Sequence, residues 1–140
     1  MTSLEYIAIR EFRRFAISNI YPDTVYMIMT EIQKEFSADQ MKFDQFPQPT
    51  IKFNCEIERD ENNSIFIGKL HTVLKRIIID YFNTPEIIKI IRNRIYTNVV
   101  NEDTKNLLNS CLTQIQLGNL QYVCLLFNIT VLGSTVYIYL

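Results

Sequence analysis

The chain has 140 residues and is 48% hydrophobic, which is enough for one domain with a core of its own. Its net charge of −1 gives no electrostatic attraction to nucleic acid or to an anionic membrane, so we expect neither as a partner. Three glycines and no glycine-rich phosphate-binding motif argue against a loop-rich enzyme with phosphate-cradling turns.

The N-terminal segment predicts two amphipathic helices. Residues 4–18 carry apolar side chains at helical spacing, with charged side chains off that face. Pro22 stands at a permitted first-turn position of a second helix, whose apolar positions continue to Phe36. We therefore predict a helical hairpin over residues 1–37.

A linker and one strand are predicted next. Residues 38–49 are mostly polar and contain Pro47 and Pro49, which interrupt regular structure, so we expect a linker there. The segment Thr50–Glu58 alternates apolar and polar side chains, a period of two that predicts a half-buried strand.

The middle of the chain predicts three more helices. The first covers Ile65 to Phe82 and begins after a capping residue, Asn63 or Ser64. The sequence Thr84-Pro85-Glu86 restarts a second helix, because it supplies a cap, a first-turn proline and an acid in the first turn. Residues 101–104, Asn-Glu-Asp-Thr, are a break or a re-capping point, and the third helix that follows is closed by Gly118.

The strongest β pattern of the chain is Tyr122–Leu140, which is rich in β-branched and aromatic residues. Gly133-Ser134 divides it into the two strands of a hairpin, since glycine supplies the positive φ of a tight turn. Such a continuous apolar run predicts strands buried on both faces. The expected fold class is α+β: helices packed on a small antiparallel sheet, preceded by the N-terminal helical hairpin.

We predict no catalytic, cofactor-binding or metal-binding residue, and we expect that the protein is not an enzyme. His71 is the only histidine, and a lone histidine makes a zinc site only where cysteines converge on it. Cys55, Cys111 and Cys124 are an odd and widely spaced set, typical of reduced thiols and not of a disulfide framework. A small cysteine-dependent enzyme remains a minor alternative.

The segment Leu117-Gly118-Asn119-Leu120-Gln121-Tyr122 and the apolar strand after it resemble the helix-to-strand turn of the Tctex1-type dynein light chains. On this resemblance, residues 50–140 form the light-chain-like domain. Ile65–Phe82 and residues 101–116 match its two helices. The chain departs from the family pattern in one additional helix and in too few strands after the helices. On this resemblance the sheet would be incomplete, or a partner would complete it.

The resemblance implies a non-enzymatic dynein light-chain-like subunit of a microtubule motor or axonemal assembly, in the cytoplasm and cytoskeleton or in a cilium. It would bind a dynein intermediate chain or another light chain by strand addition, as a homodimer or heterodimer. The partner-binding residues would be Tyr122, Cys124, Leu126, Asn128, Thr130, Thr135, Tyr137 and Tyr139. The alternative hypothesis is a small helical adaptor, or a viral or parasite effector, that acts by protein–protein interaction outside the dynein system, through helix-face residues such as Arg92 and Tyr96.

Overall fold

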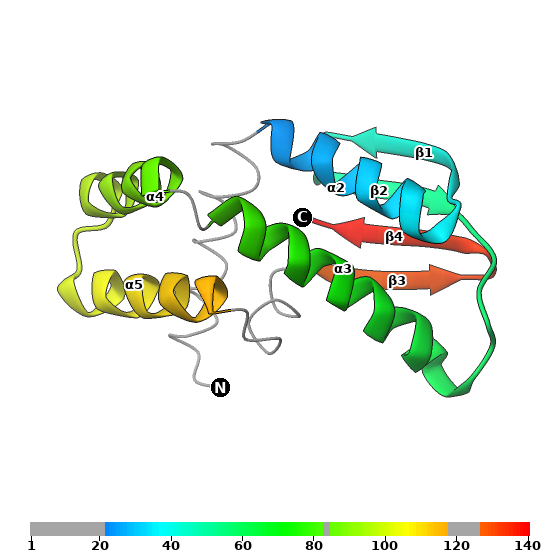
Figure 1. Cartoon of the computed structure of the whole chain (residues 1–140). Helices are drawn as coiled ribbons and strands as arrows, with labels where there is room; N and C mark the ends of the chain where they lie inside the picture. Colours follow the sequence, from blue (N-terminus) through cyan, green and yellow to red (C-terminus); the bar gives the residue numbers. More distant parts are fainter. Residues whose placement is uncertain (1–21, 83–84, 118–126) are drawn as a thin grey trace.

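The computed structural model describes residues 22–82, 85–117 and 127–140 (Figure 1). These ranges form an α+β fold of four α-helices and a four-stranded antiparallel sheet, which confirms the predicted fold class. In chain order the elements are α2 (Pro22–Phe36), β1 (Asp39–Asp44), β2 (Thr50–Asn54), the one-turn helix η2 (Glu61–Asn63), α3 (Ser64–Phe82), α4 (Pro85–Asn98), α5 (Glu102–Gln116), β3 (Asn128–Leu132) and β4 (Thr135–Tyr139).

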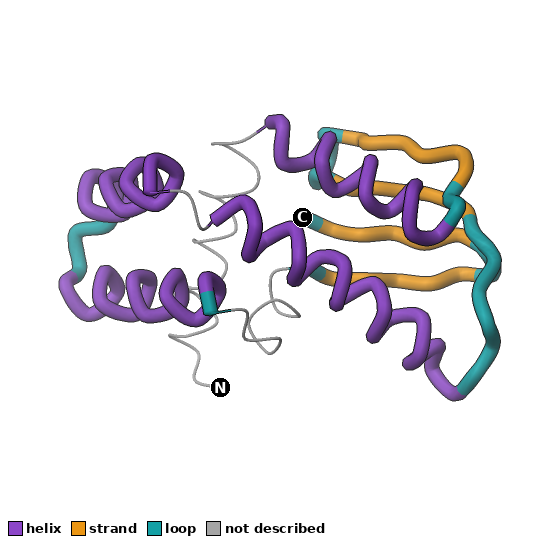
Figure 2. Tube along the Cα trace, in the orientation of Figure 1, coloured by secondary structure: helices purple, strands orange, loops and turns teal. Residues whose placement is uncertain are grey.

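The sheet has the strand order β1-β2-β4-β3, and every neighbouring pair is antiparallel. β1–β2 and β3–β4 are hairpins of adjacent segments, whereas β2–β4 joins two distant parts of the chain. Asn54 lies opposite Thr135, which is 81 positions further on. Figure 2 shows α2 and α3 side by side in front of the sheet, with α4 and α5 as a pair beyond the end of the strands.

The helix boundaries follow the signals in the sequence. Pro22 begins α2 and Pro85 begins α4, as predicted from their first-turn positions. The side chain of Asn101 accepts a hydrogen bond from the amide of Thr104 at 3.1 Å and so caps α5. The cap of α3 differs from the prediction, because the Asp60 carboxylate accepts from the Ser64 hydroxyl at 2.6 Å and from the amide of Ile65 at 3.3 Å. One oxygen of the Asp60 carboxylate, Oδ2, accepts both of these hydrogen bonds.

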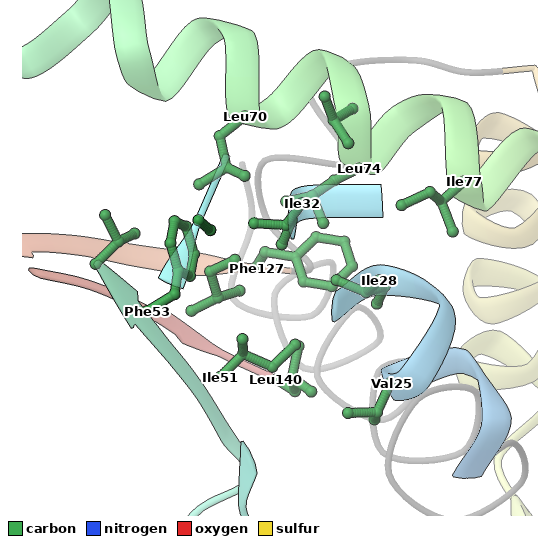
Figure 3. Close-up of a cluster of buried hydrophobic side chains, with 14 of the residues drawn as sticks. Val25, Ile28, Ile32, Ile51, Phe53, Leu70, Leu74, Ile77, Phe127 and Leu140 are labelled. Atoms are coloured by element: carbon green, nitrogen blue, oxygen red, sulfur yellow. The ribbon is translucent and has the colours of Figure 1, made fainter. Parts of the chain in front are cut away.

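One hydrophobic core lies between the helices and one face of the sheet (Figure 3). Strand alternation points Ile51 and Phe53 of β2 and Val136 and Ile138 of β4 to the helices, and all four are fully buried. Each such side chain contributes about 1.5–3 kcal/mol to folding. Further buried side chains of this core come from α2, from α3 and from the residue before β3: Val25, Ile28, Ile32, Leu70, Leu74, Ile77 and Phe127.

Part of the predicted linker is a strand. Within residues 38–49, the segment Asp39–Asp44 forms β1 and pairs with β2. Met41 and Phe43 alternate with polar residues, a short period-two signal that the prediction missed beside Pro47 and Pro49. Only Met41 of this strand packs against the core, in a half-buried position, and pairing with β2 holds the strand in place. β2 itself is shorter than predicted, because it ends at Asn54 and not at Glu58.

Over residues 128–139 the terminal hairpin forms as predicted, but it is not buried on both faces; the first five residues of the predicted hairpin, 122–126, lie outside the described residues. Gly133 has a φ of 63° in the first loop position, which a type II′ hairpin turn requires. In β4, fully buried and half-buried residues alternate, because helices cover only one side of the sheet. The sheet is also larger than the sequence suggests, since β1 and β2 of the same chain extend the hairpin to four strands.

The helix predicted over residues 4–18 lies outside the part of the chain that the structure describes. Among the residues that are described, none of the helices is both long enough and apolar enough to span a bilayer.

Candidate functional site

The face of the sheet that points away from the helices carries the predicted partner-binding residues that the structure describes. Asn128 and Thr130 of β3 pair across the hairpin with Tyr139 and Tyr137 of β4, so their side chains share one face. Thr135 lies on the same face, two positions before Tyr137. We call these five residues, together with Lys52 and Asn54 of β2, the open face. The other three predicted residues, Tyr122, Cys124 and Leu126, lie outside the described residues.

An aromatic pair occupies the centre of the open face. The rings of Tyr137 and Tyr139 lie nearly parallel, with centroids 6.4 Å apart and an interplanar angle of 11°. The ammonium group of Lys52 lies 5.8 Å from the centroid of Tyr137, within the range of a cation–π contact. Both tyrosines are half-buried, so they offer apolar ring surface together with a polar hydroxyl. The sequence prediction did not include Lys52, which only the β2–β4 register places beside Tyr137.

A short chain of hydrogen bonds holds the turn end of the open face in place. The Thr135 hydroxyl donates to the Asn54 side-chain oxygen at 2.9 Å, and the Asn54 amide donates to the Gln40 side-chain oxygen at 2.8 Å. These bonds connect β4, β2 and β1 in turn. Because Thr135 and Asn54 use their polar groups on each other, we assign them a structural role within the open face.

β4, which carries three of the predicted partner-binding residues, is not an edge strand. It lies between β2 and β3, and both neighbours pair with it along its whole length. The residues from Thr135 to Tyr139 can therefore contribute side chains to a partner but no main-chain hydrogen bonds. The sequence suggested an edge because the pairing of β2 with β4 is long-range and leaves no local signal.

Two hydrogen bonds at the ends of β4 fix the direction of the main-chain groups in both β4 and β3. The amide of Leu140 donates to the carbonyl of Pro49 at 2.9 Å, and the carbonyl of Ser134 accepts from the amide of Cys55 at 3.1 Å. The amides and carbonyls of the even-numbered residues of β4 therefore point toward β2. Since the main-chain groups of successive strand residues point to opposite neighbours, the amides and carbonyls of the odd-numbered residues of β4 point toward β3. There they bond to Asn128, Thr130 and Leu132, which lie opposite them. The main-chain groups of Ile129 and Val131 consequently point outward.

The outer edge of β3 lacks the features that normally protect an edge strand. Its sequence, Asn-Ile-Thr-Val-Leu, contains no charge and no proline, and Leu132 is 62% exposed. Among the described residues, no strand pairs with this edge. Edges of this kind readily accept another strand.

The outer edge of β1 is protected. A bulge interrupts the pairing between Asp39 and Lys42, and Gln40 within it has a φ of 51°. Three of its six residues are charged, and Lys42 pairs with Asp44 at 3.5 Å. Bulges and charges both discourage strand addition. Among the described strands, β3 therefore has the edge that is available to a partner.

The charged helix faces have internal partners. The guanidinium of Arg76 on α3 pairs with Glu31 at 3.2 Å and with Glu35 at 2.8 Å on α2. The hydrogen bond with Glu35, foremost among several contributions, raises the pKa of Arg76. Arg92 donates to the Asn109 side chain at 3.3 Å and so joins α4 to α5. These contacts give both arginines a structural role.

The residue most relevant to the helical-adaptor alternative is Tyr96 on α4. Its side chain is 57% exposed, and the ammonium group of Lys105 lies 5.4 Å from its ring centroid. A single exposed aromatic side chain with one cation is a common surface arrangement. It makes α4 a weaker candidate than the sheet.

An open hollow of about 680 Å³ lies where the end of α2 meets the sheet. Cys55 lines it, and burial, followed by the charge of Asp39, raises the pKa of the Cys55 thiol, although Arg59 partly opposes this effect. A raised pKa leaves little thiolate near neutral pH, so Cys55 is a poor nucleophile. The other lining residues are Glu35, Phe36, Ser37, Asp39, Asn54, Glu56 and Ser134.

The remaining candidates for chemistry are His71, Cys111 and Cys124. Burial lowers the pKa of the half-buried His71 on α3, which favours its neutral form. Cys111 is buried in α5, and Cys124 lies outside the described residues. Within residues 22–82, 85–117 and 127–140, no three histidine, cysteine or acidic side chains come close enough to hold a metal ion.

Comparison with known proteins identifies no relative. A scan against family models, a search of the curated proteins and a search of the solved structures each gave no match to this chain. The resemblance to the Tctex1-type light chains therefore stays a prediction that rests on the residues around the Leu117-Gly118 turn, most of which lie outside the described residues.

Proposed function

We propose that this protein is a non-enzymatic binding module that accepts an extended segment of a partner protein as an additional strand beside β3. The observation that carries the proposal is that the main-chain groups of Ile129 and Val131 point outward from the sheet, on an edge with no charge, proline or bulge. Together they offer two amides and two carbonyls to an incoming strand. Strand addition takes its affinity from such main-chain bonds and needs no catalytic group.

The open face supplies the selectivity of this module. Side chains of a strand added beside β3 alternate between the two faces of the sheet. Those on the open face meet Thr130 and Leu132 directly and reach toward Tyr137, one strand further in. A partner segment fits this surface best if it has an apolar or aromatic side chain at every second position and no positive charge near Lys52.

The resemblance suggests a specific partner class for the module. A segment of a dynein intermediate chain, or another light chain, would make the protein a subunit of a microtubule motor or axonemal assembly in the cytoskeleton. The second candidate is an adaptor that uses α4, and the exposed ring of Tyr96 is the observation that favours it. The two candidates predict different contact surfaces, so a single set of variants separates them.

Amide hydrogen exchange, followed residue by residue by NMR, tests the proposal. Peptides that bind the full chain are first selected from a library of extended sequences, so the natural partner need not be identified first. Exchange is measured in protein dilute enough to be monomeric, where strand addition predicts that the amides of Ile129 and Val131 exchange fast without peptide and become protected with it. The amide of Thr130 bonds to β4 and is protected in both states, so it serves as the internal control.

Two variants complete the test. Tyr96→Ala removes the exposed ring of α4, and Leu132→Lys places a charge on the β3 edge. We expect Leu132→Lys to weaken the selected peptides by about tenfold or more and Tyr96→Ala to leave their affinity unchanged, because edge charges oppose strand addition. Unchanged exchange at Ile129 and Val131 in the presence of bound peptide would contradict the proposal, as would loss of binding in Tyr96→Ala alone.

A further inference from the structure

We infer that the strand added beside β3 is β3 of a second copy of this chain, so that two protomers form a closed dimer with one continuous eight-stranded sheet. This inference rests on the proposed function, because it names the partner of the same edge. Three observations carry it: the hydrogen-bonding register of β3, the residues that this register brings together, and the contrast between the two edges of the sheet.

The register of β3 is self-complementary. In an antiparallel pair with its own copy, a two-fold axis at Thr130 places Ile129 opposite Val131 of the second copy and Val131 opposite Ile129. These are the residues whose main-chain groups point outward from β4. All four outward amides and carbonyls of each β3 then find partners, which gives four hydrogen bonds across the interface. A shift of the axis by one residue leaves some of these groups without a partner.

The side chains across this axis are compatible. On the helix side of the sheet, Ile129 meets Val131 of the second copy, and both are half-buried against the core of their own protomer. On the open face, Thr130 meets its own copy, and Asn128 lies beside the exposed Leu132. β-branched and threonine pairs of this kind favour strand pairing, and no charge faces a like charge.

The contrast between the edges explains why the assembly closes. If both edges of the sheet were available, β1 of one copy could add to β3 of the next and an open filament would grow. The bulge at Gln40 and the charges of Asp39, Lys42 and Asp44 block that edge. Because β3 has the one available edge among the described strands, the assembly is limited to two copies.

Introducing opposite charges at Thr130 tests both the dimer and its register. Thr130→Lys and Thr130→Glu are prepared separately in the full chain, and dimerisation is measured by sedimentation equilibrium. Because Thr130 faces its own copy, each variant alone sets like charges against each other and should dimerise about fivefold more weakly than the parent chain. Mixed in equal amounts, the two variants should form heterodimers in excess of the statistical half, as counted by native mass spectrometry.

A matched control is Ser110, an exposed residue of α5, the helix that lies beyond the end of the strands (Figure 2). Ser110→Lys and Ser110→Glu carry the same charges and should leave dimerisation unchanged and mixing statistical. A parent chain that stays monomeric at tens of micromolar overturns the inference. A dimer that ignores both Thr130 substitutions also overturns it, because that dimer uses another surface.

These experiments distinguish failure of the dimer from failure of the proposed binding module. If the chain is monomeric but selected peptides protect Ile129 and Val131 from exchange, the module stands and the second copy is not its partner. If neither a dimer nor a protecting peptide is found, the β3 edge is not a binding site and both proposals fail.

Discussion

Proline substitutions at two adjacent residues of β3 test the hydrogen-bond direction on which both proposals depend. Thr130 directs its amide to β4, whereas Val131 directs its amide outward. Proline removes the amide hydrogen at either position. Thr130→Pro should therefore break the sheet, while Val131→Pro should remove only a group that the isolated chain leaves to solvent.

The expected magnitudes differ by several-fold. In Thr130→Pro, the lost main-chain hydrogen bond costs about 0.5–1.5 kcal/mol, and the carbonyl of Tyr137 that loses its donor costs about 1 kcal/mol or more. We therefore expect the free energy of unfolding to fall by about 2–3 kcal/mol more in Thr130→Pro than in Thr130→Ala. For Val131→Pro against Val131→Ala, we expect a difference of about 0.5 kcal/mol or less, as for a tolerated edge proline.

Urea unfolding followed by circular dichroism measures these differences. The alanine variants remove the side chains alone, so each proline-minus-alanine difference isolates the main-chain contribution. The experiment uses the most dilute protein that the signal allows, because an interface at β3 would add its own stability at higher concentration. Equal differences at the two positions, or a larger one at Val131, would refute the assigned direction and with it the β3 edge as the site of strand addition.

Three further predictions concern glycine, histidine and arginine. A Cβ added at Gly68 or at Gly133 would meet nothing within 4 Å, but only Gly133 has a positive φ. Gly68→Ala should therefore stabilise the helix α3 by about 0.5–1 kcal/mol, whereas Gly133→Ala should destabilise the turn by about 1–2 kcal/mol. The urea midpoints of the two variants check these opposite signs. Folding lowers the pKa of His71 below its ordinary value of about 6.5, so the unfolded chain binds the proton more readily. The free energy of unfolding should therefore fall as the pH drops below about 6.5. His71→Gln should lose this part of the pH dependence when unfolding is compared at pH values of about 7.5 and 5.5. Arg76→Gln should lower the urea midpoint, and the loss should shrink in about 1 M salt because the paired groups are exposed to screening; a salt-independent loss would indicate a packing role instead.

The sequence alone determined the elements that depend on local signals. Pro22, Pro85 and Asn101 mark the starts of three helices because first-turn prolines and capping side chains act within a few residues. Gly133 identifies the hairpin for the same reason, since only a positive φ joins two strands with two residues. The apolar alternation of Ile51 and Phe53 likewise revealed β2 and its buried face.

Only the tertiary structure decided which strands are edges. The pairing of β2 with β4 joins residues 81 positions apart, and no local pattern predicts it. That pairing makes β4 a central strand, gives β1 a place that its own sequence does not predict, and leaves β3 with main-chain groups that point outward. It also brings Lys52 beside Tyr137 and so assembles the open face. Side-chain periodicity reports which face of a strand is buried, whereas hydrogen-bond partners depend on neighbours that only the folded chain supplies.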